Sequence, residues 1–166
     1  LGKSQLENAP ALKGVRIEVL GSSRAPRPRE GHAERSRLDA SRIATPRLAC
    51  LVIPEGHGIE CDFLFEFSLA CVELCPEVQF VWRLHPSVTF AGLQARNAKL
   101  RTPPGNIRRS EARLEEDLGV CQLALYRGTT AIVQAVGAGL RPVYLRRPGE
   151  MTIDPLYAMP AWRVDV

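Results

Sequence analysis

One stretch predicts the fold of this chain: Leu123-Ala-Leu-Tyr-Arg-Gly-Thr-Thr-Ala-Ile-Val-Gln-Ala-Val-Gly-Ala-Gly-Leu-Arg-Pro-Val-Tyr-Leu145. It begins with an apolar segment typical of a buried strand and continues through a Gly-Thr-Thr turn into a short helix. Gly139 stops that helix, and a second apolar segment follows. The stretch therefore predicts a βαβ unit. Its turn offers free N–H groups and two hydroxyls at a helix N-terminus, an arrangement that suits a phosphate.

Strands and helices are expected to alternate along the rest of the chain. The expected strands lie at 15–20, 48–53, 78–84, 106–108, 120–126 and 142–145. The expected helices lie at 59–74, 90–98 and 130–138, with a further helix capped by Ser110. Strands that alternate with helices predict a parallel sheet with right-handed crossovers. We therefore expect an α/β fold: a Rossmann-like three-layer α/β/α domain with a mostly parallel, twisted sheet of about five to six strands.

The length and composition predict a single domain. The chain has 166 residues, of which 45% are hydrophobic and 24% are charged, as in ordinary soluble globular proteins. We expect residues 1–47 to form a leading strand and an Arg-rich flexible loop, with a short helix near 33–44 as an option, and residues 48–166 to form the Rossmann-like domain. No apolar run of about 18 residues is present, so no transmembrane helix is expected. No signal peptide is recognised either.

The charge is mildly basic and concentrated near the start of the chain. The formal net charge is +4, from 22 Lys and Arg against 18 Asp and Glu. Arginines recur in segment 24–47, which we interpret as a solvated loop, with a basic arm for nucleic acid or an anionic membrane as the alternative. No aromatic residues that could stack on bases are interleaved there, so no nucleic-acid partner is expected.

The cysteines are expected to be buried reduced thiols of a cytoplasmic protein. There are five, an odd number: Cys50, Cys61, Cys71, Cys75 and Cys121. Four side chains have spacings that suggest a zinc site, since pairs of them lie four residues apart: His57, Cys61, Cys71 and Cys75. The chain has no paired Cys-x-x-Cys knuckle, so no metal is expected.

Unusual residues follow three of the expected strands. They are Pro54-Glu55-Gly56-His57-Gly58-Ile59-Glu60, Arg83-Leu84-His85-Pro86-Ser87 and Tyr126-Arg127-Gly128-Thr129-Thr130. Ligands of open α/β sheets sit beyond the carboxyl ends of the strands. If the strand at 48–53 is central, those at 78–84 and 120–126 lie on its two sides, with a short strand between as an option. All three loops then open on one rim.

Each loop has a plausible chemistry and a structural alternative. Gly56 and Gly58 allow positive φ and a close approach of backbone to ligand, or they only form a tight turn. Thr129 and Thr130 offer hydroxyls to a phosphate, or they only cap the helix.

The remaining polar side chains of these loops suit a nucleotide. His85 can donate to a phosphate oxygen, or mark only the end of a strand. Arg127 can pair with a phosphate bidentately. Gln134 lies one helical turn further along and can reach a ribose hydroxyl, or pack against the sheet. No Gly-x-Gly-x-x-Gly or P-loop pattern is present.

Two segments resemble the donor-binding half of GT-B glycosyltransferases. Gly128-Thr-Thr-Ala-Ile-Val-Gln-Ala135 and the following Gly139-Leu-Arg-Pro-Val143 are similar to the nucleotide-sugar motif of that family. The resemblance implies that the turn and the helix N-terminus hold the phosphates. A Glu of the family motif holds the ribose, and Gln134 stands in its place here.

Three short motifs are similar to those of bacterial sialyltransferases and polysialyltransferases: Glu55-Gly56, His85-Pro86 and Thr129-Thr130. The resemblance implies that Glu55 is a base and that the other two pairs hold a CMP group. Pro54 stands where the family has another acidic residue. The resemblance covers about residues 48–157 and leaves the first 40 residues unexplained.

The resemblance implies a set of site residues. Glu55 is the catalytic candidate. The nucleotide- or phosphate-binding candidates are Gly56, His57, Gly58, Arg83, His85, Arg127, Gly128, Thr129 and Thr130, and the ribose or sugar contacts are Gln134 and Glu150. The donor is a CMP-, UDP- or GDP-linked sugar, with no separate cofactor and no metal.

The resemblance also implies a place in the cell and a missing partner. Residues 48–166 are expected to be the nucleotide-sugar-binding domain of an enzyme that builds surface polysaccharide or lipopolysaccharide. The chain starts at Leu1 rather than Met and has room for one of the two domains that such enzymes need. We therefore expect a fragment with little or no activity alone, lacking the acceptor-binding domain. It is expected in the cytoplasm, with peripheral association at the inner face of the membrane as an option.

Two other functions stay open from the sequence. One is a domain like that of sugar-nucleotide epimerases, for which four acidic residues are available without assigned roles: Glu55, Glu60, Glu150 and Asp154. The other is a non-catalytic α/β interaction domain. In that case Thr129, Thr130 and His85 would be buried or bonded among themselves, and no cleft would open at the rim.

Overall fold

Six parallel strands form one sheet. The structure is a computed structural model that describes residues 7–8, 10–18, 48–150 and 154–166. The strands are β1 (Ala49–Ile53), β2 (Gln79–Arg83), β3 (Ile107–Ser110), β4 (Leu123–Tyr126), β5 (Arg141–Tyr144) and β6 (Val164–Asp165). Their order is β3-β2-β1-β4-β5-β6, and every neighbouring pair is parallel. This is the strand order of the Rossmann fold, so the predicted fold class is confirmed.

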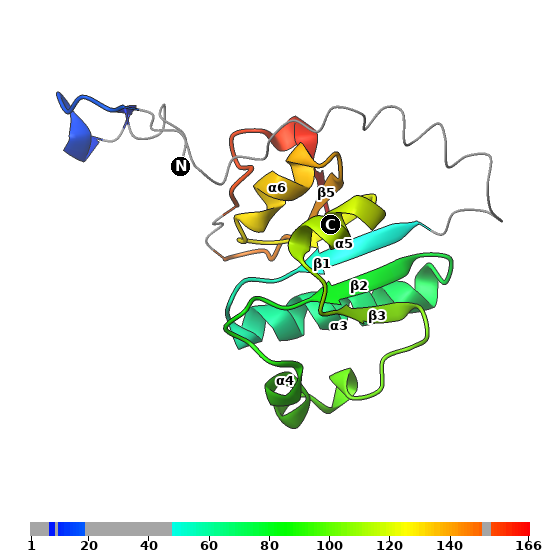
Figure 1. Cartoon of the computed structure of the whole chain (residues 1–166). Coiled ribbons are helices and arrows are strands. Elements are labelled where there is room, and N and C mark those ends of the chain that lie inside the picture. The colour runs from blue at the N-terminus through cyan, green and yellow to red at the C-terminus, as the bar shows by residue number, and fades with distance from the viewer. Residues whose placement is uncertain (1–6, 9, 19–47, 151–153) are drawn as a thin grey trace, which may run out of the picture.

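Helices cover both faces of the sheet. They are α3 (Gly58–Leu74), α4 (Phe90–Arg96), α5 (Leu114–Val120) and α6 (Ala131–Gly137), with short 3-10 helices η1 (Pro10–Leu12), η3 (Ala98–Leu100) and η4 (Pro160–Trp162). Figure 1 shows α5 and α6 on one side of the sheet and α3 on the other. The three-layer prediction is therefore confirmed.

Strand β1 supplies both cores because alternate side chains of a strand point to opposite faces. All five of its residues are buried. Val52 packs in one core with Leu64 of α3. Leu51 packs in the other with Ile132 of α6. A strand buried on both faces is a continuous apolar run, and this is why the sequence showed it clearly.

Four expectations about local structure need correction. Residues 15–18, the described part of the strand expected at 15–20, form no strand, and none of these residues is buried. Ser110 ends β3, and Arg113 is the residue that caps α5. No strand separates β1 from β4, since these two pair directly. The helix suggested near 33–44 and the Arg-rich segment lie outside the described residues.

The fourth correction concerns two glycines. Positive φ is found at Gly14, Gly139 and Gly149 among the described glycines, and so at neither Gly56 nor Gly58. Gly139 follows directly after the end of α6 with φ 90°, which confirms its predicted role as the helix stop.

The end of the chain adds a strand that the sequence did not predict. Strand β6 pairs with β5 through two residues. A buried network fixes the segment, because the Tyr126 hydroxyl donates to Asp154 (2.9 Å) and Arg163 pairs with the same carboxylate (2.9 Å). Within the described ranges, no helix is both long and apolar enough to cross a membrane.

Candidate functional site

The carboxyl ends of the strands lie level at one edge of the sheet. Ile53 of β1 is opposite Tyr126 of β4, and Arg83 of β2 is opposite Ser110 of β3. Because the strands are parallel, the loops that follow them open on the same edge, as expected. Strands β2 and β4 flank β1, so the chain order reverses between β1 and β4. Ligands of open α/β sheets bind at such a point.

The loops after β1 and β2 contact each other. The Ser87 hydroxyl donates to the Gly56 carbonyl (3.2 Å) and lies 2.8 Å from His85 Nδ1. A Cβ atom on Gly56 would come within 2.7 Å of Ser87 Oγ and 2.8 Å of His85 Nδ1. Close packing of the two loops therefore requires glycine here, rather than the positive φ that the sequence suggested. Since Ser87 occupies Nδ1, the exposed His85 ring presents Nε2 outward.

The other candidates of the first loop are less tightly held. Glu55 is half-buried, and its carboxylate has no hydrogen-bond partner among the described residues. His57 caps α3 by its backbone position alone, and its ring is exposed. Gly58 begins α3 directly against the guanidinium of Arg96, which pairs with Asp62 (2.7 Å). A free carboxylate at this position fits a base, which is the role the resemblance implies for Glu55.

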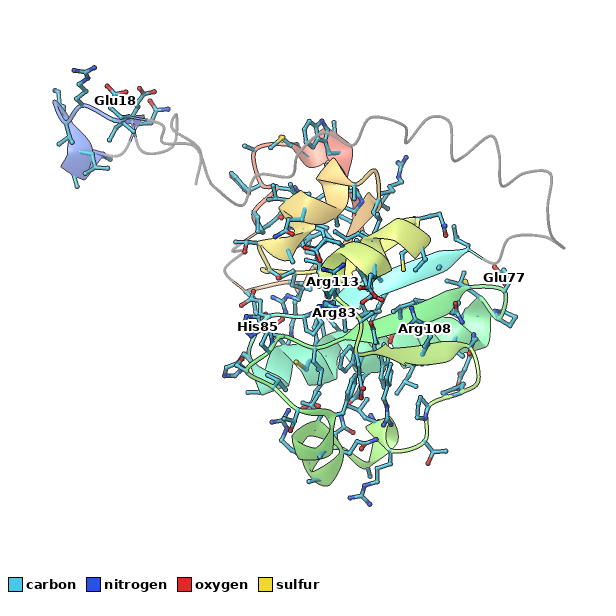
Figure 2. All side chains as sticks on the ribbon, viewed as in Figure 1. Glu18, Glu77, Arg83, His85, Arg108 and Arg113 are labelled. Carbon is cyan, nitrogen blue, oxygen red and sulfur yellow. The ribbon has the colours of Figure 1, made fainter. Side chains whose placement is uncertain are left out.

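A cavity of about 260 Å³ opens beyond β2 and β3. Its walls come from the loop after β2, the start of α4 and the loop after β3: Arg83, Leu84, His85, Pro86, Val88, Thr89, Phe90, Ser110, Glu111 and Ala112. Figure 2 shows His85 at the end of the sheet opposite Glu77. The cavity therefore lies at the edge of the sheet where ligands of this fold bind.

Arg83 is engaged by the protein itself. Its Nη1 donates to the Ala112 carbonyl (2.5 Å) and to Asp117 Oδ2 (2.8 Å). The Asp117 side chain is only 1% exposed and also accepts from the Ser110 hydroxyl (2.5 Å) and Arg108 Nη2 (3.4 Å). These bonds hold α5 against β2 and β3. The guanidinium lines the cavity, but its Nη1 donors are bonded to Ala112 and Asp117 rather than free for a ligand.

Arg127 follows β4 and is also paired internally. Its Nη2 donates to Glu150 Oε2 (2.7 Å), and Nη1 lies 3.5 Å from Glu60 Oε1 in the first turn of α3. Its guanidinium stacks over Phe63, 5.2 Å from the ring centroid. Burial acts to lower the pKa of Arg127, but the bond from Glu150 and the charge of Glu60 raise it overall. Arg127 and Glu150, two separate candidates in the sequence, thus form one ion pair.

The Gly128-Thr129-Thr130 turn leads directly into α6. Thr129 Oγ1 accepts from the Ala131 N–H (3.4 Å). Thr130 is exposed and makes no side-chain capping bond, so its hydroxyl is available to a ligand. The half-buried Gln134 amide has no hydrogen-bond partner within the described ranges. The turn therefore combines one partly engaged hydroxyl with one free one.

The cysteines form no metal site. Within the described part of the chain, no group of three or more metal-binding side chains is found. Burial raises the pKa of Cys50 to about 12 and that of Cys61 to about 11, so both thiols stay protonated at neutral pH. All five cysteines are free, and Cys50, Cys61 and Cys121 are buried as expected, whereas Cys71 and Cys75 are only partly buried.

Sequence reasoning missed two contributors, Glu111 and Asp117, and it named Glu60 without linking it to Arg127. Asp117 follows Leu114 by three residues, so helical spacing places the two side chains on one face of α5. The same spacing places Glu60 beside Leu64. Acidic residues on an inner helical face are a signal that could have been used, because buried charges require partners. Glu111 carries no such signal, since it lies in a loop.

No protein-family model matches the chain, and no curated protein matches it in sequence. Among solved structures, it is similar to Thermosulfurimonas dismutans KpsC, beta Kdo 2,4 transferase, with 16% identity and a TM-score of 0.50 over 74% of this chain and 39% of that chain. It is also similar to Thermosulfurimonas dismutans KpsC, beta Kdo 2,7 transferase, with 13% identity and a TM-score of 0.47 over 75% of this chain and 40% of that chain.

The chain thus spans about two fifths of the length of the solved structures it matches. The identity is low, so the likeness concerns the fold. It agrees with the parallel sheet. The chain therefore has a Rossmann-like α/β fold similar to part of this solved Kdo transferase structure.

Proposed function

We propose that this chain is the nucleotide-sugar-binding domain of a glycosyltransferase that builds a surface polysaccharide or lipopolysaccharide. One observation carries the proposal. The loop after β1 is joined to the loop after β2 through Gly56, Ser87 and His85, at the same edge where Thr129 and Thr130 begin α6. The three motifs that resemble sialyltransferase motifs therefore share one edge in a fold like that of a Kdo transferase.

The cavity beyond β2 and β3 suits the nucleoside part of a donor. A planar base can pack against its apolar wall, which Leu84, Pro86, Val88 and Phe90 provide. Glu111 lines the same cavity and is exposed without a hydrogen-bond partner among the described residues. A carboxylate accepts hydrogen bonds from both hydroxyls of a ribose. We assign this contact to Glu111 in preference to Gln134, which lies on α6.

The phosphate of the donor then lies between the cavity and α6. The free Thr130 hydroxyl and the first N–H groups of α6 are donors at this edge, and His85 Nε2 donates as well in the imidazolium form. The two threonines would donate to the phosphate from the start of α6, and the ring of His85 would approach it from the loop after β2. The resemblance to sialyltransferases favours a CMP-linked donor, with UDP- and GDP-linked donors as alternatives.

Transfer needs an acceptor held by a second domain. In the reaction, an acceptor hydroxyl oxygen forms a bond to the anomeric carbon of the sugar, while the bond from that carbon to the nucleotide phosphate breaks. The hydroxyl proton passes to Glu55, whose carboxylate is free to take it. We infer that the acceptor domain lies in the part of such a transferase that this chain does not cover.

The non-catalytic alternative fits the geometry less well. It requires Thr129, Thr130 and His85 to be buried or bonded within the protein. Thr129 Oγ1 and His85 Nδ1 are bonded, whereas Thr130 is exposed and makes no side-chain capping bond. It also requires a closed rim, whereas a cavity of about 260 Å³ opens beside His85. These two observations support a ligand-binding domain.

Titration calorimetry of the 166-residue chain with CMP, UDP and GDP tests the proposal. We expect one of the three nucleotides to bind. The double variant T129A/T130A should lower the affinity for that nucleotide by about tenfold or more. Thr102→Ala is the matched control, since this exposed threonine precedes β3 at the opposite end of the sheet. Absence of binding for all three nucleotides at millimolar concentration would refute the proposed function.

A further inference from the structure

The buried guanidinium of Arg127 sits at the point where the chain order reverses. Its side chain is 10% exposed and lies between α3 and the loop after β5. Glu150 Oε2 accepts a hydrogen bond from Arg127 Nη2 (2.7 Å), while Glu60 Oε1 lies 3.5 Å from Nη1. The residue follows β4 and directly precedes the Gly128-Thr129-Thr130 turn, at the edge of the sheet where ligands of this fold bind.

The bonds of this cluster are incomplete. Arg127 Nη1 and Glu60 Oε2 are both buried and have no hydrogen-bond partner. Buried polar atoms in proteins are almost always bonded, and an exception requires an explanation. An arginine can donate to two oxygens of one anion at once. Glu150 accepts from Nη2 alone, so an anion with two oxygens could accept from both Nη1 and Nη2.

The two carboxylates differ in how easily they can leave. Glu60 is fixed in the first turn of α3, and its side chain is 24% exposed. Glu150 lies in the loop after β5, and its side chain is 39% exposed. It also pairs with Arg147 (2.8 Å), which stacks over Phe63 like Arg127 does. Glu150 can turn its own charge into solvent, and Arg127 and Arg147 then both lose this partner. Because Arg127 is buried, Glu150 leaves at low cost only when another anion takes its place.

We propose that Glu150 acts as an internal substitute for a ligand oxyanion, and that a phosphate or carboxylate of the ligand displaces it to bind both Nη atoms of Arg127. The proposal deepens the proposed function and rests on it, because it makes Arg127 a ligand-binding residue that is blocked in the empty domain. An oxyanion with two free oxygens supplies the bond that Nη1 lacks.

Glu60 is compatible with an arriving anion. Burial raises the pKa of its carboxyl above the ordinary value of 4.5, and the charges of Glu55 and Glu150 raise this pKa further. The charges of Arg127 and His57 lower it, but the pKa stays raised overall. The group therefore accepts a proton more readily than an exposed carboxyl does. A protonated Glu60 donates to an anion instead of repelling it.

The experiment compares E150Q with E77Q by titration calorimetry. Both variants remove one negative charge, but Glu77 is exposed at the opposite end of the sheet (Figure 2). The probes are inorganic phosphate, CMP, cytidine and free N-acetylneuraminate. Release of this partly exposed ion pair should strengthen anion binding by E150Q about two- to fivefold, with no change for E77Q.

The probes separate the sources of the anion. A gain for CMP and phosphate but not cytidine assigns the site to the donor phosphate, whereas a gain for N-acetylneuraminate alone assigns it to a sugar carboxylate. Equal gains in E150Q and E77Q, or no gain for any anion, overturn the proposal. Wild-type binding of CMP with no gain in E150Q leaves the proposed function intact. A phosphate gain without nucleotide binding by either protein leaves only the anion site.

Discussion

Two arginines at the same edge of the sheet have opposite surroundings. Arg83 ends β2 and Arg127 follows β4, and both were expected to hold a nucleotide. Arg83 bonds a carbonyl and the buried carboxylate of Asp117, which has partners on both oxygens. Arg127 keeps one buried nitrogen without a bond, beside a Glu60 oxygen in the same state.

The difference shows how a structural arginine can be told from one that can bind a ligand. Position in the sequence does not separate them, since each arginine lies at a strand end. The bonds of their Nη1 atoms do. Nη1 of Arg83 has two acceptors, whereas the buried Nη1 of Arg127 has none and would gain a bond from a ligand. The ligand-binding roles of both arginines stay predictions, and the comparison favours Arg127.

Loss of the Asp117 carboxylate should have the largest effect on folding. Asp117→Ala leaves Arg83 without its charged partner, and removing one partner of a buried pair costs about 3 kcal/mol or more. Urea denaturation measures the free energy of unfolding. Glu116→Ala on the same helix is the control, because this exposed side chain pairs only with Arg113 and should change little. A loss below about 1 kcal/mol for Asp117→Ala would show that the cluster around Arg83 is not structural.

Gly56→Ala should separate effects on binding from effects on folding. The new Cβ would press on Ser87 Oγ and His85 Nδ1, so the hydrogen bond between the loops is lost, at a cost of about 1 kcal/mol. Nucleotide affinity should fall more, because the ring of His85 moves. Gly105→Ala is the control, since nothing lies within 4 Å of a Cβ there. Unchanged affinity in Gly56→Ala would mean that the joined loops do not form the site.

Glu60→Gln should have the smallest effect and the opposite sign. The folded-state pKa of Glu60 is raised above 4.5, so the folded protein binds this proton more tightly than the unfolded chain does. The ionised carboxylate therefore disfavours folding above that raised pKa, and this cost disappears as the pH falls through it.

Denaturation of both proteins from about pH 7 downward measures this difference. We expect Glu60→Gln to be slightly more stable than the wild type at neutral pH. The difference should close as the pH approaches 4.5, the ordinary value of the carboxyl. A variant that is less stable at neutral pH would show that Glu60 completes a structural ion pair, as Asp117 does.

Much of the fold was predictable because local patterns carry it. The apolar runs that became β1, β2 and β4 are buried strands, and helical spacing located α3 to within one residue of its start. Strand β6 was missed because two residues are too short for a pattern. The strand expected over 15–20 is wrong in its described part, since alternation of side chains alone does not form a strand without a neighbour to pair with.

The candidate site was predictable only in part. The positions of the loops followed from the parallel order of strands, and the structure confirms that they share an edge. The contact between Gly56, Ser87 and His85 joins residues 31 positions apart, and no local signal announces it. The roles of the individual site residues stay predictions.

The sequence by itself determined the alternation of strands and helices, the two-sided burial of the sheet and the loops that carry polar residues. These depend on periodicity, which is a local property. Only the tertiary structure decided which arginine is satisfied and which is not. That distinction depends on where Asp117, Glu60 and Glu150 come to lie, on elements distant in sequence. Hydrogen bonding of a buried charge is a matter of directions and distances of a few ångströms, and these exist only once the layers have packed.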